Sequence, residues 1–269
     1  MTLFDKFLRI RELGIFSIIV VFVIVAAIID PRFMTFDSWR AVFLAIPLIL
    51  VMAMGQMMVI ICRHVDISIG SILAFSAIVI GLLYIQFPGL SLWLSLIITA
   101  FVGLVMGLIN GFIVTRFNVH SIIVTLGTLS LYRGLVFIVS GGRQIDRNDI
   151  PEHVVSFSQT SFFFSIPAIL IFSAIIVIIT HLVMRHSVIG REIYATGSNP
   201  VAAHLKGINV TKVTLFCFGV CGMLAGVAGL FYASRFGYVN PGVTGVGIEF
   251  IVIAGVIIGG TSITGGSGS

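Results

Sequence analysis

Long apolar runs separated by short polar segments dominate the sequence from residue 14 onward. A membrane helix needs about 20 mostly apolar residues to cross roughly 30 Å of hydrocarbon. Seven such runs cover residues 14–29, 41–62, 67–85, 91–115, 120–139, 165–184 and 213–234. An eighth run begins near Ile248 and is only partly present when the sequence stops at Ser269. The pattern predicts an all-α polytopic membrane helix bundle with seven complete spans and the start of an eighth.

The first run is short and follows a basic segment, so a cleaved signal peptide is an alternative to a membrane span. The run ends at Ile29, followed by Asp30 and Pro31, without the pair of small residues that a signal peptidase recognises. We therefore expect a retained span.

Charged residues divide unevenly between the two sides that alternate along these spans. With the N-terminus in the cytoplasm, the inside segments carry nine basic and four acidic residues, and the outside segments carry five of each. The inside basic residues are Lys6, Arg9, Arg11, Arg63, Arg116, Arg185, Arg191, Lys206 and Lys212. Because cytoplasmic loops of membrane proteins are enriched in Lys and Arg, this distribution predicts a cytoplasmic N-terminus.

The composition excludes most other classes of protein. Hydrophobic residues make up 58% of the 269 residues and charged residues only 9%, whereas a soluble domain carries roughly 25% charged residues. A soluble enzyme is therefore excluded. The net charge of +5 is not gathered into the basic patch that nucleic acid requires, so no nucleic-acid partner is expected.

The polar segments and the small residues describe how the bundle is organised. Residues 140–164 form an outer segment rich in turn residues, and residues 185–212 form a basic cytoplasmic segment. The other connections are short, so residues 1–269 are expected to form a single transmembrane domain. Glycines recur at helical spacing in two spans, at positions 103, 107 and 111 and at positions 219, 222, 226 and 229. Small residues at this spacing favour close helix packing in lipid.

Several catalytic and ligand-binding motifs are absent from the sequence. There is no G-x-x-x-x-G-K-[ST] loop, so the chain is not expected to hydrolyse a nucleotide by a P-loop mechanism. There is also no zinc-protease motif and no nucleophile elbow. Cys62, Cys217 and Cys221 show neither disulfide nor metal-ligand spacing. The sequence predicts neither an enzyme nor a cofactor or metal site.

Charge within the spans is rare, and Arg133 is the main exception. One interpretation is that Arg133 extends its side chain toward the outer membrane surface. The other is an outer ion pair or a docking contact, with Glu249 as the partner at the same level.

Polar but uncharged residues within the spans suggest a path for a neutral solute. Asn110, Thr125, Thr128 and Ser130 could supply hydrogen bonds to hydroxyl groups along such a path. The alternative is that these side chains bond to their own helix backbone, as Ser and Thr commonly do in membrane helices.

The cytoplasmic segment contains start and stop signals for a short helix. Ser198 or Asn199 can cap it, Pro200 suits its first turn, and Gly207 suits its end. We therefore expect a helix over residues 200–206, through which a partner could move two spans at once.

The same segment resembles the coupling loop of ABC-importer permeases of the ribose/monosaccharide type. The family pattern G-x-N-x-x-A-A-x-x-x-G-I is matched in register by Gly197, Asn199, Ala202, Ala203, Gly207 and Ile208. Three further blocks agree in family order, at residues 65–71, 123–134 and 259–266. The resemblance covers nearly the whole chain.

The resemblance implies a permease subunit of the bacterial inner membrane. Such permeases work in pairs, with cytoplasmic ATPase subunits, an external solute-binding protein and a small carbohydrate-like solute. Residues 197–208 would then couple to the ATPase, and the outer segment 140–164 would either contact the binding protein or form a passive loop. An autonomous channel or secondary carrier is the alternative, although it would not need a bracketed cytoplasmic helix.

The sequence departs from the family pattern in two places. Arg63 and His64 stand where many ribose-type members carry glycine, which looks closer to the rhamnose and autoinducer-2 branches. Those branches can pair two different permease chains. Family members also continue through further spans, so the chain is expected to be C-terminally truncated. Asp66 is interpreted as a helix cap paired with Arg63 or as a second ATPase contact.

Overall fold

The computed structural model describes residues 11–162 and 166–268. The chain divides into two compact units, Met1–Ala45 and Ile46–Ser269, which are described separately. In the first unit, α2 (Arg11–Ile29) is followed by a 3-10 helix η1 (Pro31–Met34) and the first part of α3 (Phe36–Ile61). The Asp30 side chain caps η1 by accepting a hydrogen bond from the backbone N–H of Arg32.

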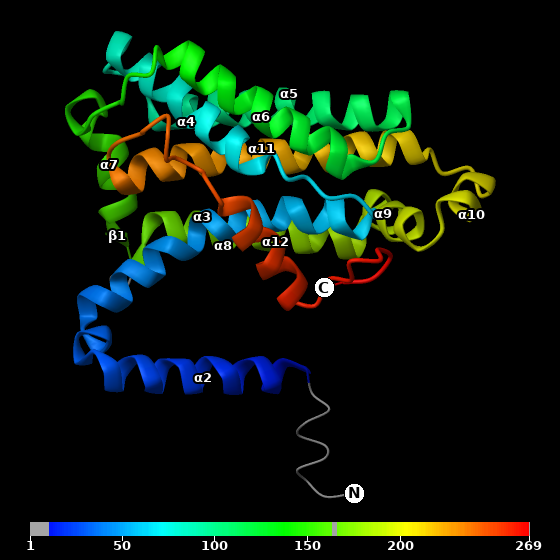
Figure 1. The fold of residues 1–269 in the computed structure, drawn as a ribbon, viewed down its shortest axis with the longest axis horizontal. Coiled ribbons are helices and arrows are strands. Elements are labelled where there is room, and N and C mark those ends of the chain that lie inside the picture. The colour runs from blue at the N-terminus through cyan, green and yellow to red at the C-terminus, as the bar shows by residue number, and fades with distance from the viewer. Residues whose placement is uncertain (1–10, 163–165, 269) are drawn as a thin grey trace, which may run out of the picture. The chain divides into compact units, whose positions relative to one another are not determined.

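The second unit contains the rest of α3 and all later elements (Figure 1). They are α4 (Ile69–Gln86), α5 (Leu92–Phe117), α6 (Ser121–Ser140), η2 (Arg147–Asp149), α7 (Glu152–Gln159), β1 (Ser161–Phe162), β2 (Ile166–Pro167), α8 (Ala168–His186), α9 (Val188–Ser198), α10 (Pro200–Leu205), α11 (Val210–Phe236) and α12 (Ile248–Ile258). The two strands form a minimal antiparallel pair.

Six helices in the described part of the chain are long and apolar enough to cross a membrane: α3, α4, α5, α6, α8 and α11. The predicted helical membrane bundle is therefore confirmed, but the predicted count of seven spans is not. The apolar part of α2, Phe16–Ile29, and the whole of α12 are shorter apolar helices. The first predicted run, 14–29, lies in α2, whose apolar part is short, so this span stays a prediction. The cytoplasmic N-terminus also stays a prediction, because residues 1–10 lie outside the described residues, as does residue 165 at the start of the predicted run 165–184.

The closest helix pair in the second unit is α5 against α11, which lie side by side in Figure 1. A Cβ atom added at Gly103 would lie 2.9 Å from the Cα of Gly226, and one at Gly222 would lie 2.7 Å from the Cα of Gly107. Only glycine allows the two backbones to approach this closely, which increases dispersion contact between helices in lipid. The predicted packing role of these glycines is confirmed.

Two non-helical segments penetrate the bundle from opposite ends. Asp66, in segment 62–68, reaches Asn110 seven residues before the end of α5, about 10 Å along its axis. Thr244, in segment 237–247, reaches Arg133 seven residues before the end of α6, again about 10 Å along the axis. Segment 237–247 meets the first turn of α4, directly after segment 62–68, where Gly245 lies against Gly70. Helices α4 and α12 therefore begin inside the bundle rather than at its surface.

Candidate functional site

Segment 185–212 contains two short helices, α9 and α10, with well-defined caps. Asn199 Oδ1 accepts hydrogen bonds from the backbone N–H groups of Val201 and Ala202, each at 3.1 Å. Pro200 occupies the first turn, where no backbone donor is needed. Gly207 has a φ of 86°, a left-handed conformation that suits glycine after a helix. The predicted short helix is present, and it ends at Leu205 rather than at Lys206, which is its C-cap.

The two faces of α10 differ sharply in exposure. Ala203 is 4% exposed and faces the protein, whereas Val201 and Leu205 are 70% and 82% exposed. Residues four apart lie on the same face of a helix, so these two apolar side chains project together into solvent. The family pattern contains Ala202 and Ala203 but not this pair, which was not predicted. The i, i+4 spacing of Val201 and Leu205 around the two alanines was the signal that could have identified it.

The matched positions on either side of α10 are packed against the bundle. Gly197 is buried, and a Cβ atom there would lie 2.7 Å from the backbone nitrogen of Gly266. Ile208 is half-buried, and its N–H donates to the carbonyl of Ala203 at 3.1 Å. The segment 197–208 is therefore packed against the bundle at Gly197, Ala203 and Ile208, and Val201 and Leu205 lie among its exposed residues.

A cavity of about 450 Å3 lies beside α10, and segment 62–68, the α5–α6 turn and the start of α11 complete its lining. Its lining includes His64, His120, Thr196, Pro200 and Thr211. Burial, with His120 nearby, lowers the pKa of His64 to about 4. His64 is therefore neutral near pH 7, and Arg63 is the permanently charged residue in the lining of the cavity.

A buried polar cluster surrounds Asp66, which is fully inaccessible to solvent. Asp66 Oδ1 accepts hydrogen bonds from the N–H and hydroxyl of Ser68, at 2.8 and 2.7 Å, and Oδ2 accepts one from Asn110 Nδ2 at 3.2 Å. Tyr132 donates its hydroxyl to Asn110 Oδ1 at 3.2 Å. The cluster links the start of α4 to α5 and α6.

The interpretation of Asp66 as a partner of Arg63 or a contact for the ATPase is wrong. Arg63 Nη2 donates instead to the carbonyl of Ser198 at 2.7 Å. Since Asp66 has no exposed surface, it cannot offer an external contact in this conformation. Its bonds to the N–H and hydroxyl of Ser68 fix the residue that precedes α4, but they do not cap a first-turn N–H of that helix.

The residues proposed for a solute path occupy different places. Asn110, Thr125 and Thr128 are buried, whereas Ser130 is exposed. Thr125 contacts the carbonyls of Val65 and Ile122, each at 3.4 Å. Thr128 and Ser130 bond to carbonyls of their own helix, at 3.4 and 3.3 Å. The structure therefore brings Asn110 and Thr125 to the 62–68 segment but leaves Ser130 on another face.

Arg133 and Glu249 lie near the point where segment 237–247 meets the first turn of α4. Arg133 Nη1 donates to the carbonyl of Thr244 at 2.6 Å. Glu249 is 7% exposed, and its carboxylate lies against Gly70 in the first turn of α4. Among the described residues the ion pairs are Arg143–Asp149 and Arg147–Glu152. The pairing of Arg133 with Glu249 stays a hypothesis.

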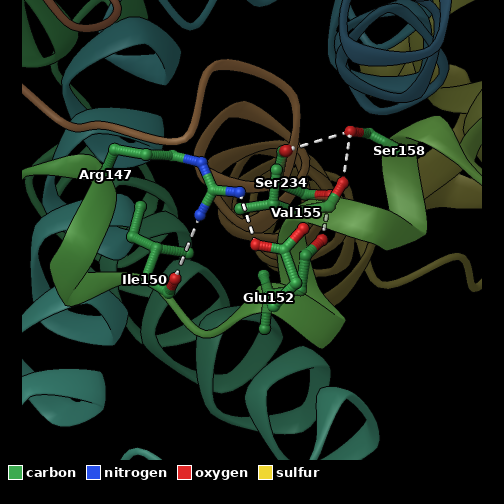
Figure 2. Close-up of polar contacts among 7 residues, drawn as sticks. Arg147, Ile150, Glu152, Val155, Ser158 and Ser234 are labelled. Carbon is green, nitrogen blue, oxygen red and sulfur yellow. Dashed lines mark hydrogen bonds and ion pairs between the residues drawn. The ribbon is translucent and has the colours of Figure 1, made fainter.

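Helix α7 and the residues just before it pack against the end of α11 (Figure 2). Arg147 donates to Glu152 at 2.6 Å, and Ser158 donates to the carbonyl of Ser234 at 2.9 Å. The Ser234 hydroxyl donates in turn to the carbonyl of Val154 at 2.5 Å. The two serine bonds fix α7 to the bundle. The charged side chains of Arg147 and Glu152 are exposed.

Comparisons with known proteins agree with this architecture. Residues 40–267 match the family described as branched-chain amino acid transport system / permease component. The autoinducer 2 import system permease protein LsrC of Yersinia enterocolitica is 34% identical over 242 residues, which cover 90% of this chain and 66% of that protein. The proteins of the same name from Yersinia pseudotuberculosis (strain IP 31758) and Yersinia pestis (strain Pestoides F) are each 33% identical, over 90% of this chain and 67% of theirs. The chain thus spans about two thirds of the length of these relatives. No solved structure matched the chain.

Proposed function

The chain belongs to the family of ABC-importer permease components, and from this we propose that it is the transmembrane permease subunit of an ABC importer. It would carry a small, neutral, carbohydrate-like solute inward across the bacterial inner membrane. Autoinducer-2 is the first solute to test, since it appears in the names of the relatives. A separate ATPase would supply the energy, and an identical or homologous permease chain would complete the translocation pathway.

The observation that carries the proposal is the exposed apolar face of α10. A capped helix that is held to the bundle and presents Val201 and Leu205 to solvent is suited to enter a groove on another protein. Burial of one such side chain contributes about 1.5–3 kcal/mol. The pair would therefore contribute a large part of the binding free energy of an ATPase. The packed side of α10 would transmit movement of the ATPase to the spans.

The outer segment is suited to the docking of the solute-binding protein. Its ion pairs and its bonds to α11 provide a fixed, charged surface on which a solute-binding protein could dock. The uncharged side chains of Asn110, Thr125 and Thr128 are buried within the spans, and in a conformation that frees them they would offer hydrogen bonds to a neutral solute.

Leu205→Asp tests the proposed function directly. The tagged full chain is co-expressed with the ATPase, binding-protein and second permease subunits of its transport system, and ATPase recovery and autoinducer-2 uptake into proteoliposomes are measured. We expect Leu205→Asp to weaken ATPase binding by about 30-fold, the equivalent of about 2 kcal/mol. Val188→Asp is the matched control, because Val188 is also exposed but lies at the start of α9. ATP-independent uptake by the wild type would instead identify a channel or secondary carrier.

A further inference from the structure

Three segments that are distant in the sequence meet beside α10. They are residues 61–63 at the end of α3, residues 197–198 at the end of α9, and residues 262–268 after α12; we call this meeting point the junction. The N–H of Gly266 donates to the carbonyl of Ile61 at 2.9 Å, and Arg63 Nη2 donates to the carbonyl of Ser198 at 2.7 Å. Residues 61–63 are therefore hydrogen-bonded to both of the other segments.

The junction is tightly packed as well as hydrogen-bonded. A Cβ atom on Gly266 would lie 2.7 Å from the Cα of Ser198, and one on Gly265 would lie 2.9 Å from the carbonyl oxygen of Ile61. Gly197 is in contact with the same carbonyl. Because the backbones leave no space for side chains, one segment cannot shift without displacing the others.

Arg63 holds an unusual conformation at this point. Its φ of 66° lies in the left-handed region, where residues other than glycine are uncommon. Such a conformation persists only where the surroundings determine it, and here the guanidinium is anchored on the carbonyl that precedes Asn199, the cap of α10. The side chain thus connects the base of α10 directly to the end of α3.

The segment that begins at Arg63 continues into the centre of the bundle. The N–H of Val65 donates to Ser121 Oγ at 3.1 Å, and Asp66 and Ser68 bond to Asn110. The helix α4 starts directly after them. A displacement of Arg63 would therefore reach the start of α4 through only five residues.

We propose that the junction is the transmission element of the permease, with Arg63 as its principal positioning residue. This inference rests on the proposed function. Movement of α10 by the ATPase is carried by the Arg63–Ser198 contact to segment 62–68, and from there to the start of α4, which segment 237–247 contacts. Tyr194 supports the same junction by donating its hydroxyl to the carbonyl of Gly268 at 2.9 Å.

The experiment measures ATP hydrolysis by the complete complex in proteoliposomes, with and without autoinducer-2-loaded binding protein. The principal variant is Arg63→Gly, because glycine keeps the left-handed backbone while removing the guanidinium. We expect the ATPase to remain bound at wild-type stoichiometry while the ratio of stimulated to basal hydrolysis falls about fivefold or more. Arg63→Lys should restore part of this ratio, since lysine keeps the charge and a donor.

Two further variants separate coupling from general stability. Tyr194→Phe should lower the ratio in the same direction, and adding it to Arg63→Gly should produce little further loss because both act on one junction. Arg116→Ala is the control, because Arg116 is an exposed cation at the end of α5 and should leave the ratio unchanged.

The outcomes distinguish this inference from the proposed function. An unchanged ratio of stimulated to basal hydrolysis in Arg63→Gly would overturn the proposed role of the junction but leave the permease assignment intact. The same holds if the ratio falls only in proportion to reduced assembly of the complex. A wild-type chain that recruits no ATPase would overturn both.

Discussion

Replacing Asp66 by alanine tests whether the buried cluster holds the non-helical segment in place. The substitution removes the acceptor of three hydrogen bonds, two from Ser68 and one from Asn110. A hydrogen bond to a charged group contributes about 1.5–3 kcal/mol, so the gross loss is about 5–9 kcal/mol. Removing a buried charge also recovers several kcal/mol of desolvation cost. We therefore expect a net destabilisation of about 3–4 kcal/mol.

That net loss corresponds to a fall of about 10 °C in the unfolding midpoint, at roughly 2–4 °C per kcal/mol for a domain near this size. Asp66→Asn should lower it much less, by about 3 °C, because the amide oxygen can still accept both bonds from Ser68. The two variants therefore separate loss of the acceptor from loss of the charge.

A thiol-reactive fluorophore can follow this unfolding in detergent. Cys62, Cys217 and Cys221 are free and buried, so they react when the bundle opens. Glu152→Ala is the matched control, because it deletes a carboxylate from the exposed Arg147 pair, which is expected to contribute at most about 1 kcal/mol. If Asp66→Ala unfolds within 2 °C or so of that control, the reasoning about the cluster is refuted.

Three more predictions use the same purified chain or its transport assay. Gly103→Ala should force α5 and α11 apart, which lowers the free energy of unfolding by about 1–3 kcal/mol and therefore lowers the unfolding midpoint. Gly127 has open space around it, so Gly127→Ala should leave the midpoint unchanged, and equal shifts in the two variants would contradict the packing argument. Because burial lowers the pKa of His64 to about 4, the contribution of neutral His64 to the free energy of unfolding is complete above pH 6.5 and is lost as the pH falls toward 4. His64→Gln should therefore make the free energy of unfolding less dependent on pH between 6.5 and 4, and an unchanged dependence would reject this prediction. Exchanging Arg133 and Glu249 should restore uptake lost in the single variants if they form an ion pair, and no recovery at matched expression would exclude that pair.

The helical bundle could be predicted because lipid imposes strong constraints on sequence. Apolar runs of sufficient length predicted the six long helices, although not the observed number of spans, and the glycine spacings predicted close helix packing without naming the pair that forms it. The cap and stop signals at Asn199 and Gly207 similarly identified α10, because these residues satisfy backbone requirements locally.

The contacts of charged residues could not be predicted from neighbours in the sequence. Arg63 and Asp66 are three residues apart, which suggested a pair, yet Arg63 bonds to Ser198 and Asp66 bonds to Asn110. Both partners are distant in the sequence, and their positions depend on how α9 and α5 pack. No pattern of neighbouring residues predicts that packing.

The course of segment 62–68 changes how the polar residues within the spans are understood. Non-helical backbone at membrane depth is tolerated only where the protein satisfies its polar groups. Ser121, Thr125 and Asn110 contact this segment through Val65 and Asp66. In the conformation observed, the side chains of Asn110 and Thr125 are therefore engaged within the protein. A role for them in a solute path requires a second conformation in which segment 62–68 moves, and the proposed junction at Arg63 is where such a movement would begin.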